Sequence, residues 1–379
     1  MRTAAIINFV LLPLKKFRPA YSLGALVVAT VGWISTEHAF GQTNGYVVTE
    51  LSRGDSGEVP YKLNNLGDFA GRLAGAAEHG TRAAIWNHSG FKLKHLGALS
   101  GGEYSSASGI NDAGQVAGVS NTSKAMVPFA WTTTGGLRRV PLLPGDNCGQ
   151  ATAINKYGHI VGYSSGPNGA KACLWKGGTV RQLSTLSGGS SSSARAVNNS
   201  DEVVGVSGSS DGQRAVLWTK SGEVRDLGTL PGDSSSEAMA INNVGDVVGY
   251  SKGPSGMRAF LWTKGGGMEE LGILPGGNSS RALDINDSDV VVGSSTSSSG
   301  DHAFVWTRQT GIVDLNGADA LNLGMVFIEA NAINSKGKIL VMGRNAEEAD
   351  MHSATAHDAG EYCAPVPPST FLLTPTNAP

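Results

Sequence analysis

A unit of about 44 residues recurs along most of this chain, and this period constrains the fold more than any other feature. The clearest copy is residues 238–281, AMAINNVGDVVGYSKGPSGMRAFLWTKGGGMEELGILPGGNSSR. Each copy opens with an apolar residue followed by Asn, and in six copies a Trp follows about 20 residues later. These anchors are Asn64, Asn111, Asn155, Asn198, Asn242, Asn286 and Asn334, with Trp86, Trp131, Trp175, Trp218, Trp262 and Trp306. Such a period is typical of a propeller, a solenoid or another repeat array.

Each unit is predicted to contain four short strands, at residues 239–241, 246–249, 258–263 and 268–271 in the clearest copy. Residues 242–245 and 264–267 predict tight hairpins, because their glycines can adopt a positive φ. We expect the other two connections, 251–257 and 275–281, to be longer. The unit lacks the 3.6-residue apolar period of a helix. Four antiparallel strands in about 45 residues correspond to one propeller blade.

The chain ends distinguish a propeller from a β-solenoid, which is the alternative fold. Residues 46–51, YVVTEL, match the fourth strand of a unit and precede any first strand. The seventh unit supplies candidate strands at 332–334, 338–343 and 370–374 but no fourth strand. The N-terminal strand can therefore complete the last unit and close the ring, whereas a solenoid needs terminal caps. The prediction is an all-β, seven-bladed propeller, with an irregular insert at 345–368.

Residues 1–41 are predicted to be a secretory signal peptide, leaving residues 42–379 as a single repeat domain. Arg2, Lys15, Lys16 and Arg18 precede an uncharged, mostly apolar run at 20–34, and Ala39 and Gly41 place small residues before a cleavage point. The alternative is an uncleaved membrane anchor, but a run of 15 residues is short for a spanning helix. We therefore expect a secreted or periplasmic bacterial protein that is not membrane-bound after cleavage.

Composition argues against nucleic acid as a partner. The formal net charge is −2, and no basic run follows the leader, whereas nucleic-acid binding relies on clustered Lys and Arg. Three cysteines follow the leader: Cys148, Cys173 and Cys363. In an exported protein Cys148 and Cys173 could form a disulfide. The alternative is one buried thiol at Cys173 and two exposed thiols.

Several motifs that recur in order resemble the bacterial HAF extracellular repeat family. They are RAFLWT at 258–263, HAFVWT at 302–307, DLGTLPG at 226–232 and INNVGDVVG at 241–249. The similarity extends over roughly residues 46–343, although the His-Ala-Phe tripeptide itself occurs in the repeats only at His302-Ala303-Phe304. The resemblance implies an exported bacterial repeat protein. It implies no activity and no catalytic residues.

The repeated aromatic and polar residues have structural interpretations. A Phe two residues before a Trp, as in Phe260 and Trp262, lies on the same strand face, so we expect core packing between blades in preference to a sugar-stacking platform. The repeated Asn is expected to cap its own turn, because no unit has the alternating oxygens of a calcium loop.

No catalytic set, metal site or cofactor site is predicted. The chain has no G-x-S-x-G elbow and no H-E-x-x-H motif. His352 and His357 lie among carboxylates in the insert, where a metal site is an alternative to a solvated loop.

We expect binding residues on the face of the ring that carries the second-to-third and fourth-to-first connections. These connections are predicted to be long and variable, and variable loops on a rigid scaffold often carry binding sites. The candidates are Asp146, Asn147, Gln150, Asp211, Asp233, Glu237, Arg281, Asp301 and His302.

The predicted role is non-enzymatic binding of a polysaccharide or an envelope protein by a monomeric, exported module. One alternative is a secreted polysaccharide lyase or glycosidase, because propellers also carry enzymes and the fold cannot decide. Another is a structural repeat within a secreted assembly, which predicts self-association without a ligand.

Overall fold

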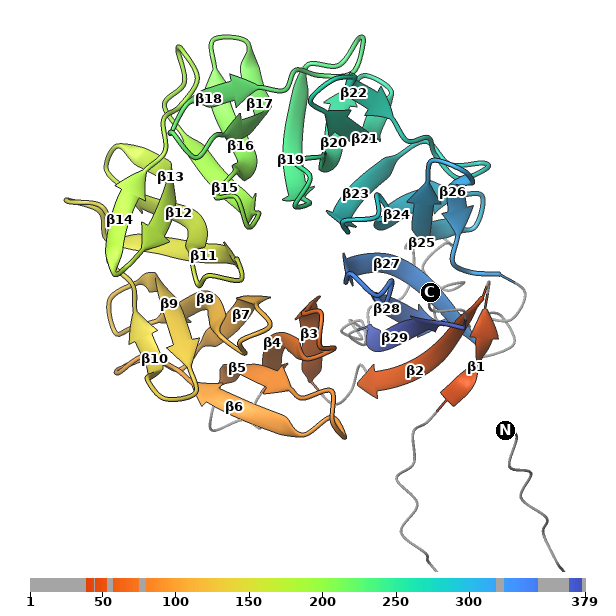
Figure 1. The fold of residues 1–379 in the computed structure, drawn as a ribbon, viewed down its shortest axis with the longest axis horizontal. Coiled ribbons are helices and arrows are strands. Elements are labelled where there is room, and N and C mark those ends of the chain that lie inside the picture. Colours follow the sequence, from red (N-terminus) through yellow and green to blue (C-terminus); the bar gives the residue numbers. More distant parts are fainter. Residues whose placement is uncertain are drawn as a thin grey trace, which may run out of the picture. The chain divides into compact units, whose positions relative to one another are not determined.

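The computed structural model describes residues 39–43, 45–52, 57–74, 80–317, 324–346 and 368–376. All of them belong to one compact unit, Glu37–Pro379. They form seven antiparallel sheets arranged around a central channel (Figure 1). The fold is therefore a seven-bladed β-propeller. No helix within the described ranges is both long and apolar enough to cross a membrane.

Each blade uses its strands in the same order, from the channel outward. The innermost strands are β3 (Glu58–Leu63), β7 (Ser105–Ile110), β11 (Cys148–Ile154), β15 (Ser192–Val197), β19 (Ser235–Ile241), β23 (Ser280–Ile285) and β27 (Met325–Ile333). The second strands are β4 (Phe69–Ala74), β8 (Val116–Asn121), β12 (Ile160–Gly166), β16 (Val203–Ser209), β20 (Val247–Gly253), β24 (Val291–Ser297) and β28 (Ile339–Asn345). The third strands are β5 (Thr81–Trp86), β9 (Met126–Thr132), β13 (Gly169–Lys176), β17 (Gly212–Trp218), β21 (Gly256–Thr263), β25 (Gly300–Thr307) and β29 (Ser369–Pro375). The fourth strands are β6 (Leu93–Gly97), β10 (Gly136–Arg139), β14 (Thr179–Gln182), β18 (Val224–Asp226), β22 (Gly267–Glu270), β26 (Gly311–Asp314) and β2 (Tyr46–Ser52).

The N-terminal strand closes the ring, as the sequence predicted. β2 pairs antiparallel with β29, so the first strand of the propeller completes the last blade. Val48 of β2 is fully buried in a cluster with Phe371 and Leu373 of β29 and Phe327 of β27. A further strand, β1 (Ala39–Thr43), adds to the outer edge of β2. β1 begins before the predicted cleavage point after Gly41, so cleavage there would remove its first three residues.

The core lies between neighbouring blades, which confirms the core interpretation of the repeated aromatic residues. The six Trp side chains of the repeats are all buried. Phe260 and Trp262 of the fifth blade pack on Val204 and Leu217 of the fourth, and the same pattern joins Phe304 and Trp306 to the fifth blade. Apolar burial of this kind contributes roughly 1.5–3 kcal/mol per large side chain. Each blade is therefore stabilised mainly by the next.

The expectation of long second-to-third connections is wrong for four blades. In the fifth blade the strands continue to a Gly253–Gly256 pair, which leaves a two-residue turn. The third, fourth and sixth blades have the same tight hairpin, closed at Gly166–Gly169, Ser209–Gly212 and Ser297–Gly300. In each, the Gly after the turn has a positive φ, and Gly adopts this conformation without a Cβ clash. The Ser- and Gly-rich residues that suggested a loop instead extend the strands.

The structure distinguishes the two alternatives for Cys148 and Cys173. Both are free thiols, so they do not form the disulfide that the sequence left open, and Cys173 is buried as the other alternative expects. Burial raises the pKa of Cys173 to about 12, as expected for an inert thiol in the core. Cys363, His352 and His357 lie outside the described residues.

Candidate binding site at one end of the central channel

The channel has a cavity at each end, and the two cavities are lined differently. The first strands begin at one end and finish at the other, where they turn into the second strands. We call the finishing end the asparagine end, because it is lined by the seven repeated asparagines, and its cavity is about 500 Å³. The opposite cavity is about 510 Å³.

At the asparagine end the seven side chains form a closed ring of hydrogen bonds. The Nδ2 of each Asn donates to the backbone carbonyl of the equivalent Asn in the next blade, at 2.9–3.3 Å. The last link runs from Asn334 of the seventh blade back to Asn64 of the first, at 3.2 Å. Each of the seven residues is buried. The ring of hydrogen bonds therefore links successive blades, including the seventh blade to the first.

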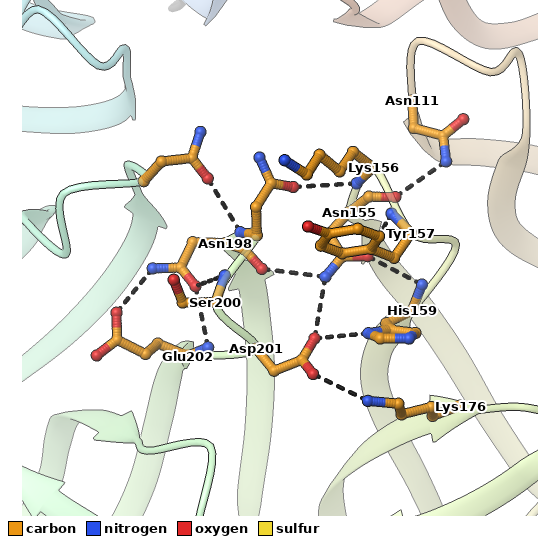
Figure 2. A network of polar contacts seen from close by, with 12 residues as sticks. Asn111, Asn155, Lys156, Tyr157, His159, Lys176, Asn198, Ser200, Asp201 and Glu202 are labelled. Atoms are coloured by element: carbon orange, nitrogen blue, oxygen red, sulfur yellow. Dashed lines mark hydrogen bonds and ion pairs between the residues drawn. The ribbon is translucent and has the colours of Figure 1, made fainter.

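Asn155 shows how one side chain performs two tasks (Figure 2). Its Oδ1 accepts from the backbone N–H groups of Tyr157 and His159, at 3.1 and 3.0 Å, which confirms the predicted turn cap. Its Nδ2 donates to the Asn198 carbonyl at 3.0 Å and to Asp201 Oδ1 at 3.2 Å. The amide uses both its donor and its acceptor, and this explains why Asn stands at this position in every blade.

Asp201 joins the ring to two residues of the third blade, His159 in the turn before β12 and Lys176 at the end of β13. Its carboxylate lies 2.6 Å from His159 Nδ1 and 3.1 Å from Lys176 Nζ (Figure 2). Burial acts to raise the pKa of Asp201, but these contacts outweigh burial and hold the pKa below its ordinary value. The carboxylate is therefore a structural, ionised group.

At the other end, every first strand carries a β-bulge. The register shifts by one residue at an equivalent position of each first strand, and the residue bulged out there lines the cavity. These bulge residues are Tyr61, Ser108, Thr152, Arg195, Met239, Leu283 and Asn331. β27 has a second shift, between Phe327 and Glu329. We call this end of the channel the bulge end. A β-bulge redirects a side chain out of the regular alternation, and bulges often occur next to functional sites.

Blades four to seven give the bulge end a charged arc. Arg195 Nε donates to Glu237 Oε1 at 2.5 Å, and the Tyr250 hydroxyl donates to Glu237 Oε2 at 2.7 Å. Arg281 pairs with Glu329 at 3.1 Å. Burial and then the Glu237 carboxylate raise the pKa of Tyr250 to about 12. Burial also raises the pKa of Glu329, only partly offset by Arg281.

Blades one to three give an aromatic and hydroxyl-rich arc. Arg72 lies over the ring of Tyr61, 5.6 Å from its centroid, and Tyr104 lines the same side of the cavity. Burial raises the pKa of Tyr61. The neutral polar residues of this arc are Ser106, Ser108, Gln150 and Thr152. The cavity therefore combines aromatic rings, neutral hydrogen-bonding groups and cations.

Three of the nine predicted binding residues meet at the bulge end. Gln150 and Arg281 line the cavity, and Glu237 holds the cavity-lining Arg195. The other six are not brought together at the channel. They are Asp146 and Asn147 on an outer groove, Asp211 at a hairpin tip, Asp233 paired with Arg258, His302 paired with Asp314, and Asp301, which is exposed and acts electrostatically on Glu329.

Sequence reasoning missed the bulge residues themselves. The available signal was the Ala-x-Ala pattern, as in residues 151–153, 194–196 and 238–240, whose central residue differs between units. Arg72 was also missed, because it lies on a second strand and reaches the cavity only through the twist and pairing of the first blade. No group of three or more His, Cys, Asp or Glu side chains able to hold a metal occurs within the described residues.

Comparison with known proteins supports the fold and leaves function open. No protein family model and no curated protein sequence matches this chain. An oligogalacturonate lyase in complex with manganese is 12% identical, with a TM-score of 0.54 over 88% of this chain and 96% of that one. The β-propeller domain of the Trilobed protease from Pyrococcus furiosus, which has an open velcro topology, is 9% identical, with a TM-score of 0.50 over 81% of this chain and 92% of that one. TolB from Acinetobacter baumannii is 14% identical, with a TM-score of 0.45; the match covers 64% of this chain and 62% of TolB.

Proposed function

We propose that this protein is an exported, monomeric, non-enzymatic binding module that takes a polysaccharide or an envelope protein at the bulge end of its channel. The observation that carries the proposal is the set of seven equivalent bulges, one in each blade. The backbone distortion is the same in every blade, but the side chain it directs into the cavity differs in each. A repeated backbone feature with non-repeated side chains provides an asymmetric surface on a symmetric scaffold, as recognition requires.

The proposed export rests on the leader at residues 1–41 and on the resemblance to the HAF extracellular repeats. Membership in that family is part of the same proposal.

Blocking each end of the channel in turn tests the proposal. Ser108→Trp fills the bulge-end cavity, and Ser335→Trp places the same bulk at the asparagine end, where Ser335 is exposed. A screen of acidic and neutral polysaccharides and envelope extracts should give a ligand whose affinity falls at least about tenfold in the first variant, the loss of roughly 1.4 kcal/mol or more. Equal affinity in both variants would contradict the proposed site, and stable self-association without any ligand would favour a structural repeat.

An enzymatic alternative is a polysaccharide lyase, and the observation that favours it is Glu329. This carboxylate lines the cavity beside Arg281, and burial raises its pKa. A raised pKa suits a general base near neutral pH, and an adjacent Arg can neutralise a substrate carboxylate. An oligogalacturonate lyase shares the propeller fold. Release of unsaturated sugar products by the protein, lost in Glu329→Gln, would replace the binding role with this one.

A further inference from the structure

The cations of the bulge end are not equally compensated. Arg195 and Arg281 each pair with a carboxylate, Glu237 and Glu329. Lys62 lies close enough to Asp284 to act against the rise that burial causes in the pKa of that carboxyl. Arg72 has no carboxylate within ion-pair distance in the described part of the chain, and its contact is the face of Tyr61. Among the described residues, Lys62 and Arg72 are therefore cavity-lining cations without an ion-pair partner, and Arg72 is held on an aromatic ring.

An arginine in this setting is suited to a carboxylate. Its guanidinium is always charged, is weakly hydrated and can bind both oxygens of a carboxylate. Stacking on Tyr61 restricts the guanidinium, so less conformational freedom is lost when a ligand binds. The positive charge of Arg72 therefore favours a ligand with an anionic group at blades one and two.

The groups around Arg72 match a sugar better than a peptide. Tyr61 and Tyr104 supply aromatic surface for the C–H groups of a sugar ring, and Ser108 and Gln150 supply donors and acceptors for its hydroxyls. The aliphatic residues Met239 and Leu283 belong to blades five and six, neither of which is next to the first blade in the ring. The cavity volume of about 510 Å³ lies within the range of roughly 300–1,000 Å³ typical of ligand sites.

We propose that the bulge end recognises an acidic oligosaccharide, with Arg72 binding the carboxylate of a uronic acid unit and Tyr61 and Tyr104 contacting its ring. This inference rests on the proposed binding function and names its ligand class. The charged arc of blades four to seven then faces the neighbouring units of the chain. Its carboxylates, Glu237 and Glu329, are already paired with arginines and oppose ligand carboxylates less than free ones would.

The test is calorimetric titration of the purified protein with tetragalacturonate and with its methyl ester, which has the same ring without the charge. We expect the acid to bind at least about tenfold more tightly than the ester, and more weakly as ionic strength rises. Arg72→Gln should weaken binding of the acid roughly 10- to 100-fold and leave binding of the ester nearly unchanged. Arg72→Lys, which keeps the charge, should bind the acid with intermediate affinity.

Arg225→Gln is the matched control, because Arg225 is an exposed residue on the outermost strand β18. Both Gln variants should melt within a few degrees of the parent protein, so that a loss of binding is not a loss of folding. Equal affinity for acid and ester, or equal behaviour of the two Gln variants, would overturn the acidic-sugar inference while leaving the binding function intact. Binding of tetraglutamate but neither sugar would overturn the sugar class and favour a protein ligand, and binding of none of these probes would count against both proposals.

Discussion

At one end of the channel the same residue stands in all seven blades, whereas at the other end seven equivalent positions carry Tyr, Ser, Thr, Arg, Met, Leu and Asn. Both ends belong to the same seven strands. At the asparagine end each side chain has a neighbouring blade as its partner, so any blade requires the same chemistry. At the bulge end the side chains line the cavity, and their contacts differ from blade to blade. Arg195 pairs with Glu237 of the next blade, and Thr152 donates to the Ala194 carbonyl of the next blade.

The difference separates two kinds of constraint on a repeat protein. A residue that must bond to the next copy of itself is fixed by the repeat, because every interface is the same. A residue that lines the cavity need not make the same contact in every blade and can differ from blade to blade. In this protein, a residue type that is the same in every blade therefore indicates a contact between blades. Different residue types at the same backbone position indicate the candidate binding site.

The largest effect should come from disrupting the pairing of β2 with β29, because this pairing closes the ring that forms both ends of the channel. Val48→Asp places a carboxylate at a fully buried position of β2, and burying a charge without a partner costs several kcal/mol. The melting temperature should fall by roughly 5 °C or more, because a chain of 379 residues loses on the order of 1–2 °C per kcal/mol. Thr49→Asp, at the adjacent and partly exposed position of the same strand, should have a much smaller effect. A stable Val48→Asp protein would mean that β2 does not close the ring.

A smaller effect is expected when one link of the asparagine ring is removed. Asn155→Ala loses two donated and two accepted hydrogen bonds in a buried setting, which should lower the free energy of unfolding by about 2–4 kcal/mol. Met239→Ala at the bulge end should cost about 1 kcal/mol or less, because that side chain faces the cavity. Denaturant unfolding of the two variants measures the difference between the ends. Equal losses would show that the bulge end is as structural as the ring.

The smallest effect concerns pH, and the two ends should respond in opposite directions. The pKa of Asp201 is lowered in the folded protein, so its stabilisation is present above the unfolded value of about 3.9 and is lost as pH falls through the folded value. The pKa of Glu329 is raised, so its contribution is favourable below about 4.3 and is lost as pH rises through the folded value.

Two isosteric variants separate these contributions. Asp201→Asn suits the positive φ of 63° at that position and should lose about 1 kcal/mol at pH 7, with a flatter decline in acid. Glu329→Gln should retain or slightly gain stability at pH 7, because the buried charge is removed. Melting temperatures of both variants from about pH 3 to pH 8 test the signs. A loss of stability in Glu329→Gln at pH 7 would mean that its pair with Arg281 outweighs burial.

The repeat period, the strand count and the closing strand could all be predicted from the sequence. Alternation and turn residues are local signals. The closing strand at 46–51 could be recognised by comparing its sequence with the fourth strands of the other units. The predicted turn cap of the asparagines was also local and was confirmed. The same local signals misled at residues 251–257, where Gly and Ser occur both in loops and in the tight hairpin that the strands form.

The sequence by itself determined the seven blades, the buried Trp residues and the way the ring closes, because these follow from periodicity and from pairing between adjacent segments. Only the tertiary structure decided which side chains share the channel. The hydrogen bonds that link successive blades in the asparagine ring join residues 43–48 positions apart in the sequence. The last of them, from Asn334 to Asn64, joins residues 270 positions apart. The bulges turn one residue per blade out of the regular alternation, and Arg72 meets Tyr61 across a strand pair. Such contacts depend on where the closed ring places each strand, which no local pattern records.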